Sequence, residues 1–246
     1  MLEIIGTSHI SSQSIHQIEQ AFFSPPDIVA IELDRQRLYG LLHPELKPPS
    51  FRQLWKMVGF KGAVFASFGR FIQKKLGKIV GMEPGMDMLS AYNLGKKNNS
   101  RVFLIDQPID ITLQNFSKKI SFKEKARIVT DLIGGVFGKE KIKMDLSKVP
   151  EKEMIRMLIG QLKERYPNIH QVLVADRDIY MADKLAKLIM QFPNSRIVAV
   201  VGAGHEEEMA RRVKEYVKAA QEELAKKKLE AFQEKEAKIS TEQTQG

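Results

Sequence analysis

The stretch RIVAVVGAGHEEEM, residues 196–209, carries an apolar run through two glycines and a histidine into three glutamates. The β-branched apolar residues predict a buried strand, and the glutamates predict the first turn of a helix, where negative charge is favourable. A dinucleotide-binding loop is disfavoured, because its third glycine position holds Glu207 and the three carboxylates would repel a pyrophosphate. The stretch therefore indicates a strand, a tight turn and a helix of an α/β protein.

Three more apolar runs predict strands of the same fold. They are LEIIGT (2–7), DIVAIELD (27–34) and RVFLID (101–106). A helix that begins at Ser11 or Ser12 separates the first two runs, and this strand-helix-strand unit implies parallel strands with a right-handed connection. The predicted fold class is α/β, with a central, largely parallel sheet, helical insertions and a long C-terminal helix.

The predicted domain organisation is one α/β domain at residues 1–209, followed by a charged helix and a frayed tail at residues 210–246. Helical insertions account for most of residues 40–100 and 111–190. The charged helix carries an apolar stripe that thins along its length, so we interpret it as docked at its start and solvated further on. Self-association of this helix into a homo-oligomer stays open, although its heptad pattern is short and irregular.

The composition limits the chemistry that is available. The 246 residues include no cysteine, so thiolate ligands, cysteine nucleophiles and disulfides are excluded, and a metal must bind histidine, carboxylate or water. No apolar run is long enough to cross a membrane, and the amino terminus lacks the pattern of a signal peptide. We therefore expect a cytoplasmic protein, with peripheral membrane contact as the alternative.

The net charge of +9 is concentrated in one segment. Residues 46–82 hold eight basic residues and no acidic one, and their apolar residues follow helical spacing, which predicts a basic amphipathic helical insertion. Its apolar face either packs on the core or, at residues 51–80, contacts an anionic membrane or an acidic partner. No zinc finger, RNP-like strand or recognition-helix pattern accompanies the charge, which disfavours nucleic acid as a partner.

Polar residues stand at the predicted carboxyl ends of the strands, where open parallel sheets bind ligands. Two of these ends share the spacing G-x-x-H and finish in His9 and His205, and Glu32 interrupts a buried apolar run. If the two histidine-bearing strands are neighbours, these side chains suit zinc, manganese, cobalt or iron(II). The spacing leaves an alternative equally open, in which the histidines bond carbonyl groups beside their turns and Glu32 pairs with Arg35 or Arg37.

Six motifs, in order, resemble the TraB/PrgY/GumN family that includes the animal Tiki proteins, and specifically its archaeal and bacterial TraB-like branch. They are GTSHIS (6–11), PDIVAIELDRQR (26–37), EPGMDMLSA (83–91), LIDQPIDITL (104–113), DRDIYMA (176–182) and VVGAGH (200–205). The resemblance extends through almost all of residues 2–209. Two positions depart from the family pattern, since Gln107 replaces an expected arginine and Glu208 replaces an expected glycine.

The resemblance implies a divergent α/β fold, related to erythromycin esterase and ChaN-like proteins. The Tiki branch is described as metal-dependent proteases that prefer manganese or cobalt, and bacterial relatives lower the activity of secreted peptide pheromones. Carried over to this sequence, the family pattern makes His9 and His205 metal ligands and Glu32 a ligand or a base. It makes Glu83 a second candidate carboxylate, and it makes Arg35 and Arg177 positively charged partners of the substrate.

We therefore predict a metal-dependent hydrolase that acts on a peptide and uses a divalent ion such as Mn, Co or Zn. Such an ion would polarise the scissile carbonyl and lower the pKa of a bound water, while Glu32 or Glu83 moves the proton. The alternative function is a non-catalytic protein that binds a peptide or acts as a regulatory protein at the membrane periphery.

Overall fold

The computed structural model describes residues 1–7, 12–45, 50–57, 59, 62, 63, 67, 85–134 and 151–244. Its strands are β1 (Leu2–Thr7), β2 (Ile28–Ile31), β3 (Arg101–Leu104) and β4 (Ile197–Gly202). Its helices are α1 (Ser12–Ala21), α2 (Arg35–Leu42), α4 (Met86–Lys97), α5 (Ile109–Lys119), α6 (Phe122–Gly134), α8 (Glu151–Arg165), α9 (Pro167–His170), the π-helix η2 (Gln171–Ala175), α10 (Asp176–Gln191) and α11 (Glu206–Thr244). The predicted α/β class is confirmed, and each predicted strand is present.

The four strands form one parallel sheet in the order β1-β4-β2-β3. The last strand of the chain thus lies between the first two, with Gly202 of β4 beside Thr7 of β1 and Val200 beside Ile31 of β2. β2 is shorter than predicted and ends at Ile31, so Glu32 follows the strand instead of lying within it. The carboxyl ends of β1, β4 and β2 consequently meet at one edge of the sheet.

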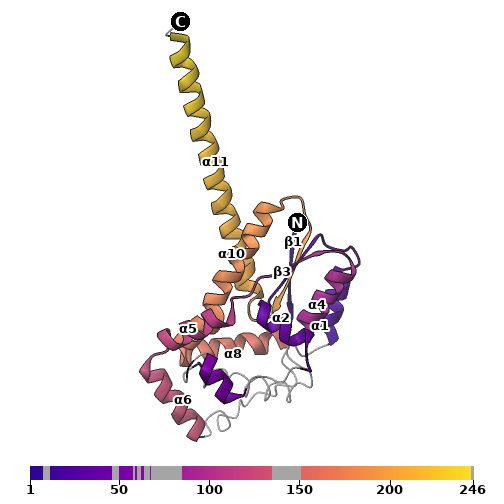
Figure 1. The fold of residues 1–246 in the computed structure, drawn as a ribbon, viewed down its shortest axis with the longest axis vertical. Helices are drawn as coiled ribbons and strands as arrows, with labels where there is room; N and C mark the ends of the chain where they lie inside the picture. Colours follow the sequence, from indigo (N-terminus) through magenta and orange to yellow (C-terminus); the bar gives the residue numbers. More distant parts are fainter. Residues whose placement is uncertain are drawn as a thin grey trace.

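Helices cover both faces of this sheet (Figure 1). On one face, α1 and α4 pack through residues such as Ile18 and Met88 against the side chains of Val29 and Val200. On the other face, α10 and α11 pack against Ala30, Ala199 and Val201. The sheet is buried on both sides, which explains why its strands are continuous apolar runs instead of alternating ones.

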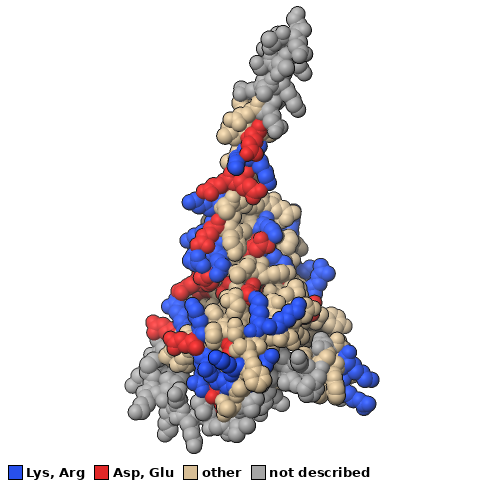
Figure 2. All heavy atoms as spheres, turned by 90° about the vertical axis from the view of Figure 1, so that its left-hand side faces the viewer, with Lys and Arg blue, Asp and Glu red and all other residues tan. Residues whose placement is uncertain are grey.

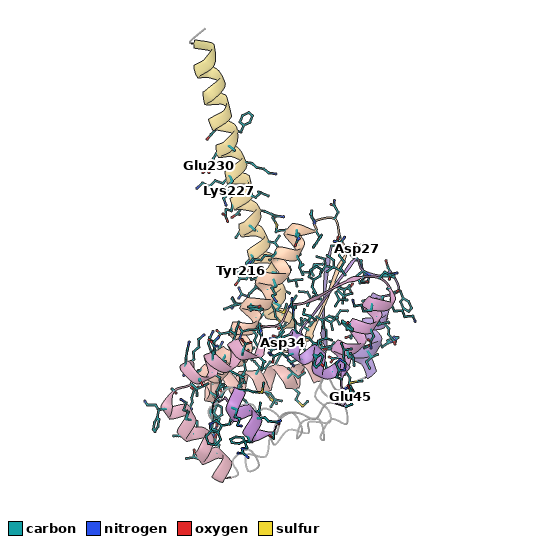
Figure 3. All side chains as sticks on the ribbon, viewed as in Figure 1. Asp27, Asp34, Glu45, Tyr216, Lys227 and Glu230 are labelled. Atoms are coloured by element: carbon teal, nitrogen blue, oxygen red, sulfur yellow. The ribbon has the colours of Figure 1, made fainter. Side chains whose placement is uncertain are left out.

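Helix α11 packs on α10 at its start and then leaves the body of the molecule (Figure 1). Met209 and Val213 are buried, whereas Leu224 and Phe232 are exposed, in keeping with the thinning apolar stripe. Positive and negative side chains mix on the projecting part (Figure 2), and Lys227 and Glu230 stand out from it in Figure 3.

Pairs of opposite charge four residues apart support the helix there, including Lys227–Glu223 at 2.6 Å. α11 continues to Thr244, through most of the tail for which the sequence predicts fraying, because extending a formed helix adds one hydrogen bond per residue.

The predicted basic amphipathic insertion at residues 46–82 lies largely outside the described residues. Its membrane-facing or core-facing role therefore stays a prediction. None of the helices in the described ranges is long and apolar enough to cross a membrane.

Candidate functional site

Glu32 lies at the centre of a buried polar cluster at the carboxyl edge of the sheet. Its Oε2 accepts a hydrogen bond of 2.6 Å from the backbone N–H of Gly202, across the gap between the ends of β2 and β4. Its Oε1 pairs with Arg177 and lies 3.5 Å from Nε2 of His205. Both carboxylate oxygens are thus in use, and the cost of burying this charge is offset by its partners.

Arg177 reaches the cluster from the first turn of α10, directly after the π-helix η2. Nε and Nη2 of Arg177 donate to the two oxygens of Asp106 at 2.9 and 2.8 Å, in a bidentate pair, and Nη2 also contacts Glu32. Nη1 donates to the carbonyl of Leu173 inside the π-helix. The wider π turn changes the angle at which residues after it leave the helix, and such turns are frequent at functional sites.

His205 ends the turn after β4 and is almost fully buried. Its Nδ1 bonds Oδ1 of Asp178 at 2.6 Å, and its Nε2 faces Glu32 and the Nη1 of Arg177, the latter at 3.3 Å. A carboxylate on Nδ1 fixes the orientation of the imidazole and leaves Nε2 as the chemically available nitrogen.

Three carboxylates and three cations make up this cluster, which we call the polar centre: Glu32, Asp106, Asp178, Arg37, Arg177 and His205. Asp106 links the two arginines of the polar centre, because its Oδ2 accepts hydrogen bonds from Arg177 and, at 2.7 Å, from Arg37. When His205 is protonated, the charges of the six groups balance. Such balance is what allows ionised groups to be buried at tolerable cost.

The pKa values follow from these contacts. Burial raises the pKa of Glu32, but the charges of His205 and Arg177 outweigh it and hold the pKa at about 2, below its ordinary 4.5. Burial lowers the pKa of His205, but Glu32 and Asp178 outweigh it, so the net shift is upward from 6.5. Below its raised pKa, Nε2 of His205 donates toward Glu32; above it, Nε2 accepts from Arg177.

Glycines let the backbone turns of the site approach their neighbours. A Cβ on Gly6 would collide with the carboxyl group of Glu206, which lies over β1. A Cβ on Gly204 would fall 2.5 Å from Cδ1 of Ile159, where α8 packs on the turn before His205. The turn that presents His205 is therefore shaped by the close contact with α8.

This contact predicts that Gly204→Ala destabilises the fold by about 1 kcal/mol, the low end of the cost of overpacking, because the atom that must move is the end of the half-buried Ile159 side chain. The additional change Ile159→Val removes the colliding Cδ1 and is expected to restore most of the loss in urea unfolding. Gly160→Ala is the matched control, because its Cβ would meet nothing within 4 Å and alanine favours helix. If Gly204→Ala alone is as stable as the wild type, the tight packing of this turn against α8 is contradicted.

The structure brings together part of the predicted site. Glu32, Arg177 and His205 meet, and β1 is a direct neighbour of β4, as the histidine pairing requires. His9 and Glu83 lie outside the described residues.

Arg35 does not join the polar centre. It is exposed on the first turn of α2, beside a cavity that Asp106 also lines. The pairing of Glu32 with Arg35, considered above, is replaced by its pairing with Arg177.

Sequence reasoning assigned no role to Asp106 and Asp178, and it named Arg37 only as a possible partner of Glu32. Asp178 and Asp106 stand inside the motifs DRDIYMA and LIDQPIDITL, next to residues already singled out or at a strand end. An acidic residue directly after Arg177 and another at the end of a predicted strand were the available signals. The partners of Asp106, Asp178 and Arg37 lie 27 to 71 residues away along the chain, which no local pattern reveals.

His205 fits a divalent ion only in part: Asp178 orients the imidazole as second-sphere carboxylates do for metal-bound histidines, but Nη1 of Arg177 lies 3.3 Å from the Nε2 that an ion would use, so Arg177 would have to move. Glu32 fits less well, because Gly202 and Arg177 already use its two oxygens. Within the described ranges, no group of three or more histidine, aspartate or glutamate side chains is gathered as a metal site would be. A site here thus requires a ligand from outside these ranges, such as His9.

The sequence of this chain is similar to those of several known proteins. The sequence model of the TraB/PrgY/gumN family matches residues 2–207. An uncharacterized protein of Methanocaldococcus jannaschii is 35% identical over 218 residues, which cover 86% of this chain and 53% of the relative. TraB domain-containing proteins of Mus musculus and Homo sapiens are each 25% identical over 227 residues, covering 82% of this chain and 60% of the relative. The chain thus spans little more than half the length of these relatives.

Proposed function

The chain belongs to the TraB/PrgY/gumN family, and from its polar centre we propose that it is a metal-dependent hydrolase that cleaves peptides. The observation that carries the proposal is the arrangement of His205, whose Nδ1 is fixed by Asp178 and whose Nε2 is turned toward Glu32. An oriented imidazole at the carboxyl end of a central parallel strand is suited to bind an ion or to move a proton.

His205 and His9 are the proposed ligands of a divalent ion such as Mn, Co or Zn. The pairing of β1 with β4 supports this pair, because Thr7 and Gly202, which precede the two histidines by two and three residues, are register partners. When bound, the ion would supply Lewis acidity, which polarises a peptide carbonyl and acidifies water.

Glu32 and Arg177 then have electrostatic roles. With a pKa of about 2, Glu32 is ionised at neutral pH and is a weak general base, so we assign to it the positioning of His205 and Arg177. Arg177 stays protonated, because Glu32 and Asp106 outweigh its burial and raise its pKa. Its guanidinium is placed to stabilise negative charge that develops on the substrate beside His205. Transfer of the proton by Glu83 stays a prediction.

A non-catalytic function is the second candidate. The observation that favours it is that the groups of the polar centre already bond one another. Arg177 contacts both Glu32 and His205, so its positive charge can take the place of a metal ion. In this version, a cytoplasmic or membrane-peripheral protein binds a peptide without cleaving it, with residues 51–80 as the proposed membrane contact.

Metal content and cleavage can be measured on the same preparations. We expect the purified chain, incubated with Mn, Co or Zn and desalted, to retain about one ion and to cleave a quenched fluorescent peptide library. His205→Ala is expected to abolish both properties. Asp178→Asn is expected to weaken metal binding about 10–100-fold, as for other second-sphere carboxylates. Lys187→Ala, on the exposed side of α10, is the control.

The outcomes separate the two candidates. If the wild type retains neither Mn, Co nor Zn after desalting, the metal-dependent mechanism is overturned. Peptide binding without cleavage, with or without metal, favours the second candidate. If the His205→Ala variant still cleaves peptides, the polar centre is not the site of either proposed function.

A further inference from the structure

A cavity of about 670 Å³ lies at the edge of the sheet, beside β3 and outside the polar centre. One wall is the strand itself, at Val102, Phe103 and Leu104, and the others include Arg35 and Lys184. Asp106 lines the cavity and also binds Arg177, so one side chain connects the cavity to the polar centre. Neither the fold nor the polar centre accounts for this space.

The backbone of β3 presents hydrogen-bonding groups to the cavity. β3 is an edge strand, and the N–H groups of Arg101 and Ile105 donate to β2 at 2.9 and 3.0 Å. Backbone groups alternate along a strand, so those of Val102 and Leu104 point away from the sheet. The carbonyl of Leu104 confirms this direction, because it accepts from Nζ of Lys184 at 3.2 Å. Within the described ranges, no strand pairs with this outer edge.

The exposed charges of the cavity are positive. Arg35 is exposed and Lys184 is half-buried, over the ring of Tyr180. The two acidic residues of the lining, Asp34 and Asp106, are buried. Asp34 caps α2 by accepting from the N–H groups of Gln36 and Arg37, and Asp106 is held by two arginines. A ligand in the cavity therefore meets cations and a strand edge.

We propose that the cavity binds an acidic peptide segment in extended form, which adds to the sheet along β3. Its backbone pairs with Val102 and with the N–H of Leu104, whose carbonyl is held by Lys184, and its carboxylates lie beside Arg35 and Lys184. Strand addition obtains affinity from main-chain hydrogen bonds and selectivity from flanking side chains. The inference rests on the proposed function, since it names the class of peptide that the hydrolase would take.

The distance to the polar centre fixes which part of the peptide is bound. β4, which leads to His205, is two strands from β3, and the added peptide makes a third step. At about 4.8 Å per strand, this amounts to roughly 14 Å, or about four extended residues. The peptide runs along β3 and has to turn across the carboxyl edge of the sheet to reach His205, so the segment recognised at β3 lies about four residues from the bond that is cleaved.

Binding can be tested separately from cleavage by fluorescence polarisation. The probe is a labelled octapeptide of alternating valine and glutamate, which can pair as a strand and carries negative charge. A second probe has the same sequence with N-methyl groups on the valine nitrogens, and a third has them on the glutamate nitrogens. N-methylation removes peptide donors without altering the protein, so one of the two methylated probes is expected to bind at least about tenfold more weakly.

The protein variants test the charges. Lys184→Glu is expected to weaken binding of the unmethylated probe about tenfold, because an attractive charge-assisted contact becomes repulsive. Lys187→Glu, three residues further on α10 and outside the cavity lining, makes the same charge change and is expected to bind as the wild type does. Hydrogen exchange at residues 101–105 is expected to slow when the unmethylated probe is bound.

Each result decides one of the two ideas. No binding of the first probe, equal binding of all three probes, or equal loss in the two lysine variants overturns strand addition at β3. If binding depends on Lys184 and on the peptide N–H groups but the library is not hydrolysed, the peptide site at β3 is supported and the hydrolase function is contradicted. If the library is hydrolysed equally well by the wild type and by Lys184→Glu, the hydrolase function is supported and the peptide site at β3 is contradicted.

Discussion

Arg177→Met is expected to lower the free energy of unfolding by about 3–5 kcal/mol, the usual cost of removing one partner of a buried ion pair. The side chain of Arg177 is 16% exposed and those of Glu32 and Asp106 are 7% and 2% exposed, so solvent screens these charges little. Without the guanidinium, the buried carboxylates of Glu32 and Asp106 lose the cation that they share. Urea unfolding at pH 7, in the presence of a chelator, measures the loss.

Two comparisons make this result interpretable. Lys187→Met removes an exposed partner of Asp183 on the same helix and is expected to change the stability by less than about 1 kcal/mol. Adding Mn is expected to restore part of the stability of Arg177→Met, because loss of Arg177 frees an oxygen of Glu32 for a cation near His205. An unchanged stability of Arg177→Met would contradict the central role of this guanidinium, and an absence of rescue would weaken the case for a metal.

The contribution of the polar centre to stability is expected to be greatest between about pH 4.5 and 6.5. The pKa of Glu32 is depressed in the folded state, so its contribution is complete above 4.5 and is lost as the pH falls toward 2. The pKa of His205 is raised, so its contribution is complete below 6.5 and is lost as the pH rises through the folded value.

Urea unfolding from pH 2 to pH 9, without divalent ions, tests this window. Other carboxylates also titrate on the acid side, so the informative quantity is the difference between wild type and Glu32→Gln. This difference is expected to shrink as the pH falls from 4.5 to 2. It is also expected to shrink above the folded pKa of His205, because neutral His205 no longer attracts Glu32. A difference that stays constant over the whole range would contradict the buried charge pair.

The strands and most helices could be predicted because their signals are local. The run IVAVVG is apolar at every position, and a strand buried on both faces requires this pattern. The helix after it begins with three glutamates, which its N-terminus favours. The π-helix η2 was missed, because the segment QVLVA has the periodicity and composition of an ordinary helix. A single inserted residue in a helical turn leaves no mark on such a pattern.

The members of the site were harder to predict than the strands. His205 and Glu32 were predicted from residue types at strand ends, and Arg177 through the resemblance to a family. Which of these groups touch depends on strand order, and the insertion of β4 between β1 and β2 is a result of packing over the whole chain. The sequence left Glu32 free to pair with Arg35 or Arg37, whereas the fold pairs it with Arg177 at a separation of 145 residues.

By itself, the sequence determined the α/β class, the strand positions and the family, because each follows from local periodicity or from motifs that can be read in order. The tertiary structure decided that the two G-x-x-H strands are neighbours and that Asp178 holds His205. It also decided that Arg177 balances the charge of Glu32 and Asp106. These outcomes depend on contacts between distant segments, whose energies are set by burial and charge in the assembled fold and not by neighbours along the chain.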